Sequence, residues 1–149
     1  MSGRWFEDFK VGDRFVTPGK TVTEGAIATM IGLGGFTMPL FNDEEYARTT
    51  PFGTRIAPGR LTLFLMGGLE EQTGVYEGCL IALLSIDKVQ FKGPLKAGDT
   101  IKVEMEVTAT RDTSKPDRGV VVHRSVCRNQ RGEAILETEA AHLLRRRPK

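Results

Sequence analysis

The stretch Pro58-Gly59-Arg60-Leu61-Thr62-Leu63-Phe64-Leu65-Met66-Gly67-Gly68 decides how this chain folds. Leu61, Phe64, Leu65 and Gly68 have the spacing i, i+3, i+4 and i+7 of one helical face, and apolar residues occupy most other positions too. A helix that is apolar on nearly all sides is a buried one. We therefore expect a helix that begins at Pro58-Gly59 and lies in the core.

After this helix the pattern changes to strands. Short turns rich in Gly, Pro, Asn and Asp separate four runs of strand composition. Connections this short favour antiparallel neighbours. A buried helix followed by an antiparallel meander predicts an α+β fold in which the sheet wraps round the helix. The expected strands are Leu80–Phe91, Thr100–Thr110, Gly119–Arg128 and Glu133–Leu144.

The amino-terminal third predicts shorter elements. Val11–Val16 has the composition of a turn that leads into a strand. Thr23, followed by Glu24, predicts a helix start, and glycines at three of positions 32 to 35 predict its end. We expect an irregular loop over Phe36–Phe41, followed by a short helical turn that Asn42 or Asp43 caps.

Length and charge set broad limits on function. With 149 residues, 40% of them hydrophobic, the chain suits one domain over residues 1–149 with a core that needs no disulfide or metal. The formal net charge of +2 gives no general drive toward nucleic acid or membrane. The apolar stretch Leu61–Leu69 is far shorter than the roughly 20 residues of a membrane span. The basic end, Arg145–Lys149, is either a solvated terminus or an anion-binding tail.

The cysteines suggest a reducing compartment. Cys79 and Cys127 stand alone, without a C-x-x-C pattern or a nearby histidine at ligand spacing. This predicts reduced thiols in a cytoplasmic protein, with no metal and no cofactor. Met1–Lys10 carries Glu7 and Asp8 and lacks an apolar core, so we expect no signal peptide there.

Two neighbouring segments, Phe36–Ala47 and Thr50–Gly59, resemble the signature of the MaoC-like (R)-specific enoyl-CoA hydratases and dehydratases. Trp5–Asp13 and Phe91–Asp99 extend the likeness over nearly the whole chain. The resemblance implies a single hot-dog domain, in which an antiparallel sheet wraps round a long central helix. It also implies an acyl-CoA thioester as the ligand and a homodimer or higher homo-oligomer with the acyl site between subunits.

The chain departs from the family in one loop. The family loop reads Gly-Asp-x-Asn-Pro-(Leu or Ile)-His, and Phe36, Met38 and Phe41 stand here at its Asp, Asn and His positions. Hydration of an enoyl thioester needs one group that takes a proton from water and one that delivers a proton to the α-carbon. Phenyl rings and a thioether do neither, and each lost acid–base group costs roughly 10²- to 10⁴-fold. We expect no efficient hydratase chemistry from these positions.

What remains of the family site is its thioester-holding part. The resemblance assigns the backbone N–H of Gly59, at the start of the buried helix, to polarise the thioester carbonyl. The alternative is that Gly59 only forms a tight turn. Arg55 and Arg60 bracket this position and suit CoA phosphates or a substrate carboxylate, and the alternative is that they form ordinary interface or surface ion pairs. The expected binding set is Gly59, Phe36, Met38, Phe41, Arg55 and Arg60.

Few other titratable residues are placed to replace the lost dyad. Glu24, Glu44 and Glu45 are either displaced general bases or carboxylates of helix first turns. His142 alternates with apolar neighbours and should point inward as a core or interface residue, while the face of His123 is undecided because Val120, Val121 and Val122 precede it.

Two functions from different classes follow. The first is an enoyl-CoA hydratase or 3-hydroxyacyl-CoA dehydratase whose acid–base residues have been rebuilt. The second is a non-catalytic acyl-CoA-binding or structural hot-dog subunit that pairs with an active one. A hot-dog thioesterase would need a carboxylate or a water-positioning group that faces the thioester, and the sequence locates none.

Overall fold

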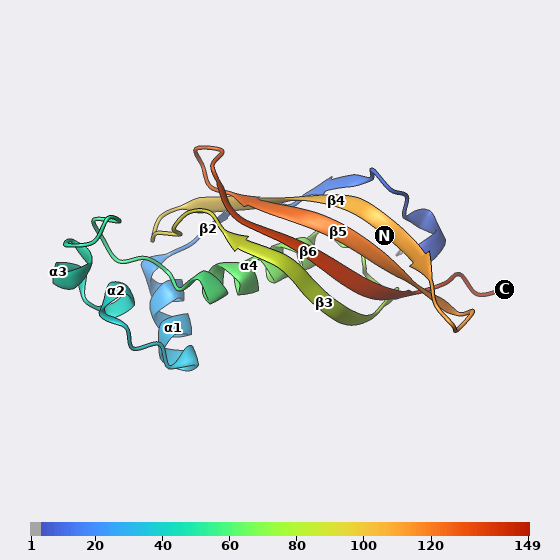
Figure 1. The fold of residues 1–149 in the computed structure, drawn as a ribbon, viewed down its shortest axis with the longest axis horizontal. Coiled ribbons are helices and arrows are strands. Elements are labelled where there is room, and N and C mark those ends of the chain that lie inside the picture. Colours follow the sequence, from blue (N-terminus) through green and yellow to red (C-terminus); the bar gives the residue numbers. More distant parts are fainter. Residues whose placement is uncertain (1–3) are drawn as a thin grey trace.

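The computed structural model describes residues 4–149, so the first three residues of the segment expected to lack a signal peptide lie outside it. A long antiparallel sheet curves over one helix (Figure 1). The strand order is β1-β4-β5-β6-β3, and the short β2 also pairs with β4. The strands are β1 (Arg14–Val16), β2 (Lys20–Thr21), β3 (Leu80–Phe91), β4 (Thr100–Asp112), β5 (Arg118–Arg128) and β6 (Ala134–Arg145).

Helix α4 (Gly59–Gln72) lies along the concave face of the sheet (Figure 1), which confirms the predicted α+β plan. Leu61, Met66 and Leu69 of α4 are at most 5% exposed and pack in the core. The expectation that the helix is buried on all sides is wrong, because Phe64 is 71% exposed. The sheet covers only one side of the helix, so its apolar opposite side is left open.

The four long strands agree with the sequence prediction to within two residues at each end. In β4 the side chains of Ile101, Val103, Met105 and Val107 alternate into the core, because one face of the sheet packs on α4. Strand β3 is different. It pairs on one side only, with β6, and exposes apolar side chains along its length.

Three short helices gather at one end of the sheet (Figure 1). Helix α1 (Glu24–Gly34) begins at Thr23, whose hydroxyl accepts from the Ala26 N–H, and ends at Gly35 in the left-handed region. Helix α2 (Pro39–Asn42) replaces the irregular loop expected up to Phe41. Pro39 explains the difference, since a proline in the first helical position presets the backbone angle. Asp43, one of the two expected caps, caps α3 (Glu44–Ala47).

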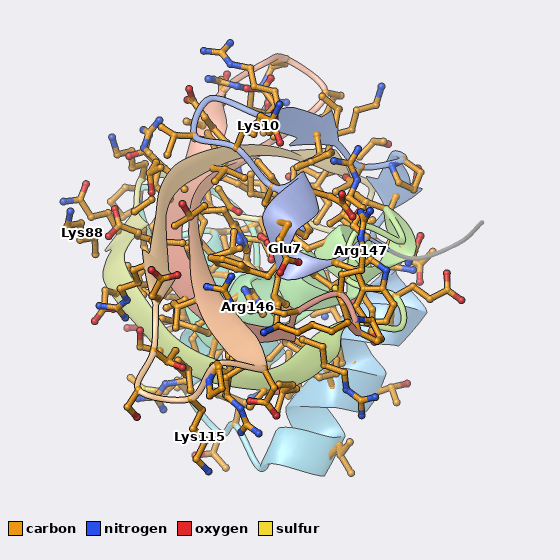
Figure 2. All side chains as sticks on the ribbon, turned by 90° about the vertical axis from the view of Figure 1, so that its right-hand side faces the viewer. Glu7, Lys10, Lys88, Lys115, Arg146 and Arg147 are labelled. Atoms are coloured by element: carbon orange, nitrogen blue, oxygen red, sulfur yellow. The ribbon has the colours of Figure 1, made fainter. Side chains whose placement is uncertain are left out.

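The carboxy-terminal segment meets the first described residues at the opposite end of the sheet. Arg146 and Arg147 reach the short helix η1 (Phe6–Asp8), where they pair with Glu7 at 3.5 Å and Asp8 at 2.7 Å (Figure 2). The Arg146 guanidinium also lies 4.5 Å from the centre of the Phe6 ring. These two basic residues therefore anchor the end of the chain to its beginning. No helix within residues 4–149 is long and apolar enough to cross a membrane.

Candidate functional site

A cavity of about 600 Å³ opens at the amino-terminal end of α4. Side chains from α2, the segment before α4, the first turn of α4 and the end of β3 form its walls, which are mostly apolar. Thr62, Arg60 and Lys92 are its only hydroxyl-bearing or charged side chains, and none of the described residues that line it is a carboxylate or an imidazole. The cavity therefore suits an apolar ligand with a charged portion at one side.

Gly59 is the first residue of α4 and lines this cavity. The first N–H groups of a helix have no acceptor within the helix, so they favour a carbonyl or anionic oxygen placed before them. A Cβ atom at Gly59 would lie 2.6 Å from the Phe91 ring, so this ring packs directly on the glycine. The close approach explains why a residue without a side chain stands there. It does not decide between the two expectations for Gly59, the tight turn and the N–H that polarises a thioester carbonyl.

The segment Phe36–Phe41, where we expect a departure from the family pattern, lies next to this cavity. Phe36 and Phe41 pack edge to face, with their ring centres 6.1 Å apart, and both are half-buried against the core. Phe41 lines the cavity beside Gly59. Phe36 and Met38 are not among its lining residues, and Met38 is 61% exposed. The structure therefore brings together Gly59, Phe41 and Arg60 from the expected binding set.

Arg55 is engaged by two carboxylates. Its guanidinium lies 2.7 Å from Glu24 and 3.0 Å from Glu44, so it ties α1 to α3. Hydrogen bonds from the Thr54 hydroxyl and then from Arg55 lower the pKa of Glu44, which makes this carboxylate a weaker base. Glu45 pairs with Arg48 at 3.0 Å. These contacts favour the structural explanation for Arg55 and for the three glutamates.

Several buried or cavity-lining residues could not be predicted from the sequence. Phe91 ends β3 and Lys92 follows it, in a segment that carries the family resemblance, but no spacing rule connects them to Gly59. No sequence pattern marks Tyr76, although its side chain is buried and its hydroxyl is hydrogen-bonded to His123. His142 is 9% exposed, as its inward position predicted, and His123 is 1% exposed.

Comparison with known proteins gives the same family by sequence and by structure. The model of the MaoC like domain matches residues 8–127. An (R)-specific enoyl-CoA hydratase from Rhodospirillum rubrum is 32% identical over 136 residues, which cover 91% of this chain and 88% of that protein. The X-ray structure of an Archaeoglobus protein described as a monoamine oxidase regulatory protein superposes with a TM-score of 0.90 at 34% identity, covering 98% of this chain and 97% of the other.

The chain thus belongs to the MaoC-like domain family of hydratases and dehydratases. Its fold is the hot-dog fold. A Mycobacterium tuberculosis protein with a double hot-dog fold superposes with a TM-score of 0.85 at 22% identity. The superposition covers 99% of this chain and 46% of that one. The expected family and the expected fold are both confirmed.

Proposed function

We propose that this protein binds enoyl or 3-hydroxyacyl thioesters of CoA in the cavity beside Gly59, and that the Asp and His dyad of its family is absent. The observation that carries the proposal is the composition of this cavity. It combines a helix amino-terminus and apolar walls with the absence, among its described lining residues, of any carboxylate or imidazole.

Each part of the cavity suits one part of the ligand. The N–H of Gly59 donates to the thioester oxygen and polarises the carbonyl. The apolar walls contact the acyl chain. Arg60, which is exposed and forms no ion pair within residues 4–149, suits a CoA phosphate. Lys92 is less available, because it pairs with Glu137 at 3.1 Å.

Hydration by such a site should be slow. Polarisation of the carbonyl remains, but both proton-transfer groups are replaced by phenylalanine. We therefore expect crotonyl-CoA hydration to be several orders of magnitude slower than in a relative that has the dyad. The alternative, an enzyme with rebuilt acid–base groups, predicts an ordinary turnover of roughly 1 to 10³ per second.

Two measurements test the proposal. The first is calorimetric titration with butyryl-CoA, with free CoA as the reference ligand. Butyryl-CoA should bind more tightly than CoA, and Arg60→Ala should weaken both. Arg48→Ala, which removes a surface arginine paired with Glu45, serves as the matched control and should change neither. The second is the rate of crotonyl-CoA hydration. Absence of thioester binding contradicts the proposal, and an ordinary turnover establishes the alternative.

We infer further that the protein is a homodimer that pairs along β3. This strand lies at the edge of the sheet, and Leu80, Ile81, Leu83, Leu84 and Ile86 are each at least 38% exposed. An apolar sheet edge of this length favours a second copy. Leu84→Lys should give monomers in sedimentation, whereas Val16→Lys, at an exposed apolar position on β1 at the other edge, should not. A wild-type monomer at micromolar concentration would refute the inference.

A cytoplasmic location remains part of the proposal. Cys79 and Cys127 are both buried and unpaired. Burial raises the pKa of Cys127 to about 12, so its thiol stays protonated and unreactive at neutral pH. Two inert thiols suit a reducing compartment.

A further inference from the structure

A second cavity, of about 230 Å³, lies further along α4, between this helix and strands β3 and β6. Leu63, Met66 and Gly67 of α4 line it, together with leucine and isoleucine side chains of β3. These walls suit a hydrocarbon chain. We call it the distal cavity, to distinguish it from the cavity beside Gly59.

One side of the distal cavity is polar. The polar residues that line it are Glu70, Glu71, Tyr76, Thr138 and His142. The Tyr76 hydroxyl lies 2.7 Å from His123 Nδ1, and His123 Nε2 lies 3.4 Å from Glu70 Oε2. With the Glu70 carboxylate as acceptor, His123 carries its hydrogen on Nε2, and Nδ1 accepts from the Tyr76 hydroxyl. The Tyr76 oxygen and the second oxygen of Glu70 then keep lone pairs that can accept a further hydrogen bond, and both residues line the cavity.

His142 completes the polar side with an unpaired imidazole. Its ring stacks on Tyr76, with ring centres 4.6 Å apart, and its Nδ1 is buried without a hydrogen-bond partner. Because a buried N–H without an acceptor is especially rare in proteins, we place the hydrogen on Nε2. Burial lowers the pKa of His142 to about 4, so the ring is uncharged at neutral pH. His142 therefore offers one neutral N–H donor to the cavity that it lines.

Distance decides which part of a ligand this polar side can meet. Gly67 and Glu70 follow Gly59 by eight and eleven residues, which correspond to about 12 and 16 Å along the helix. The α- and β-carbons of a thioester held at Gly59 lie only one and two bonds from its carbonyl carbon, so the polar side cannot supply the missing hydratase groups. An extended chain advances roughly 1.2 Å per bond, so a chain of about ten to thirteen bonds reaches it.

We propose that the distal cavity receives the far end of the acyl chain and selects a chain that carries a hydroxyl group at that end. This inference rests on the proposed binding of thioesters at Gly59. A hydroxyl group accepts a hydrogen bond from the His142 N–H and donates one to Glu70 or Tyr76, so a single group pairs with both the donor and the acceptors of the cavity. A methyl end leaves His142 unpaired. A carboxylate end meets the acidic side chains of Glu70 and Glu71 beside an uncharged ring.

The test compares matched ligands on the unmodified protein. Calorimetry gives the Kd of decanoyl-CoA and 10-hydroxydecanoyl-CoA, and of dodecanoyl-CoA and 12-hydroxydodecanoyl-CoA. The hydroxyl should tighten binding about tenfold in at least one pair, the effect of one or two net hydrogen bonds. The CoA monothioester of decanedioic acid should bind less tightly than decanoyl-CoA. Equal affinities within both pairs overturn this inference and leave the proposed function standing, whereas absence of binding by all ligands overturns both.

Two variants assign the preference to His142. His142→Phe keeps a ring that can stack on Tyr76 but removes the N–H, so the hydroxyl preference should disappear while plain chains bind within about twofold of the wild-type Kd. Ser125→Ala is the matched control, because Ser125 Oγ is the other buried side-chain atom without a partner in residues 4–149 and lies outside this cavity. It should keep the preference. A preference that persists in folded His142→Phe refutes the role of His142, and the wild-type comparison stays decisive if that variant fails to fold.

Discussion

The Phe36 ring packs edge to face against the Phe41 ring, with ring centres 6.1 Å apart and an interplanar angle of 84°. The two positions to which the family resemblance assigns the acid–base pair are therefore in contact as an aromatic pair. Both rings are half-buried against the core, so the pair contributes to packing. On the proposed assignment, this pair gives the loop an apolar wall in place of a reactive one.

The first prediction concerns repair of this pair. Phe36→Asp combined with Phe41→His should restore measurable crotonyl-CoA hydration, while each single change should not, because the two groups act as a unit. The Phe36→Asp change should also lower the stability of the fold, because a carboxylate among apolar side chains loses hydration and its pKa rises. The measurements are the hydration rate and thermal melting.

The single variants and butyryl-CoA binding serve as controls for the repair. A double variant that melts like the parent, binds butyryl-CoA and shows no gain would contradict the assignment. It would mean that the loop does not present positions 36 and 41 to a bound thioester.

The second prediction concerns the contact between Gly59 and Phe91. Gly59→Ala keeps the backbone N–H but places a Cβ 2.6 Å from a Phe91 ring carbon, so the ring must move. Because Phe91 lines the same cavity, butyryl-CoA binding should weaken about tenfold. The combination with Phe91→Ala should recover most of the loss. If Gly59→Ala binds butyryl-CoA like the parent, the ring is not a fixed wall of the cavity.

Much of the fold could be predicted from the sequence, because the decisive signals are local. Strands β3 to β6 follow from runs of strand composition between short turns, and α4 follows from its apolar spacing. The exposure of Phe64 could not be predicted, since it depends on how far the curved sheet covers the helix. Helix α2 was missed because its four residues contain no periodicity, only a proline in the right place.

The candidate site was less predictable, because its contacts join distant segments. Arg55 was expected either near CoA or in an ion pair, and only the fold shows that Glu24 and Glu44 reach it from two helices. The distal cavity was missed altogether. Its polar side joins α4, the following turn and β6, and no motif of the sequence links Tyr76 to His142.

The third prediction concerns the ion pairs of Arg55. Arg55→Ala should lower the free energy of unfolding by about 1 kcal/mol, because the side chain is only 34% exposed and holds two carboxylates. Urea denaturation measures the change. Arg48→Ala, which breaks a more exposed pair with Glu45, is the control and should cost less than about 0.5 kcal/mol. Equal losses in the two variants would show that the Arg55 contacts add no stability of their own.

The last prediction concerns pH and His142. Burial, and then the neighbouring His123, lower the pKa of His142 from 6.5 to about 4, against a smaller opposite effect of Glu70. Between these two values the unfolded chain binds a proton that the folded protein does not, so stability must fall as the pH falls from about 6.5 toward 4. The full pKa difference corresponds to about 3 kcal/mol.

The His142→Phe variant isolates this contribution. Carboxylates with lowered pKa values, such as those of Glu44 and Glu137, also make the protein less stable in acid, but they do so equally in both proteins. The difference in unfolding free energy between wild type and His142→Phe should therefore shift in favour of the variant by 1 to 2 kcal/mol between about pH 6.5 and pH 5, as urea denaturation would measure. The unfolding free energy of Ser125→Ala should change with pH in the same way as that of the wild type over this range. Parallel curves for His142→Phe and wild type would mean that His142 takes up a proton in the folded protein as readily as in the unfolded chain, and that it is not the neutral donor which the distal cavity requires.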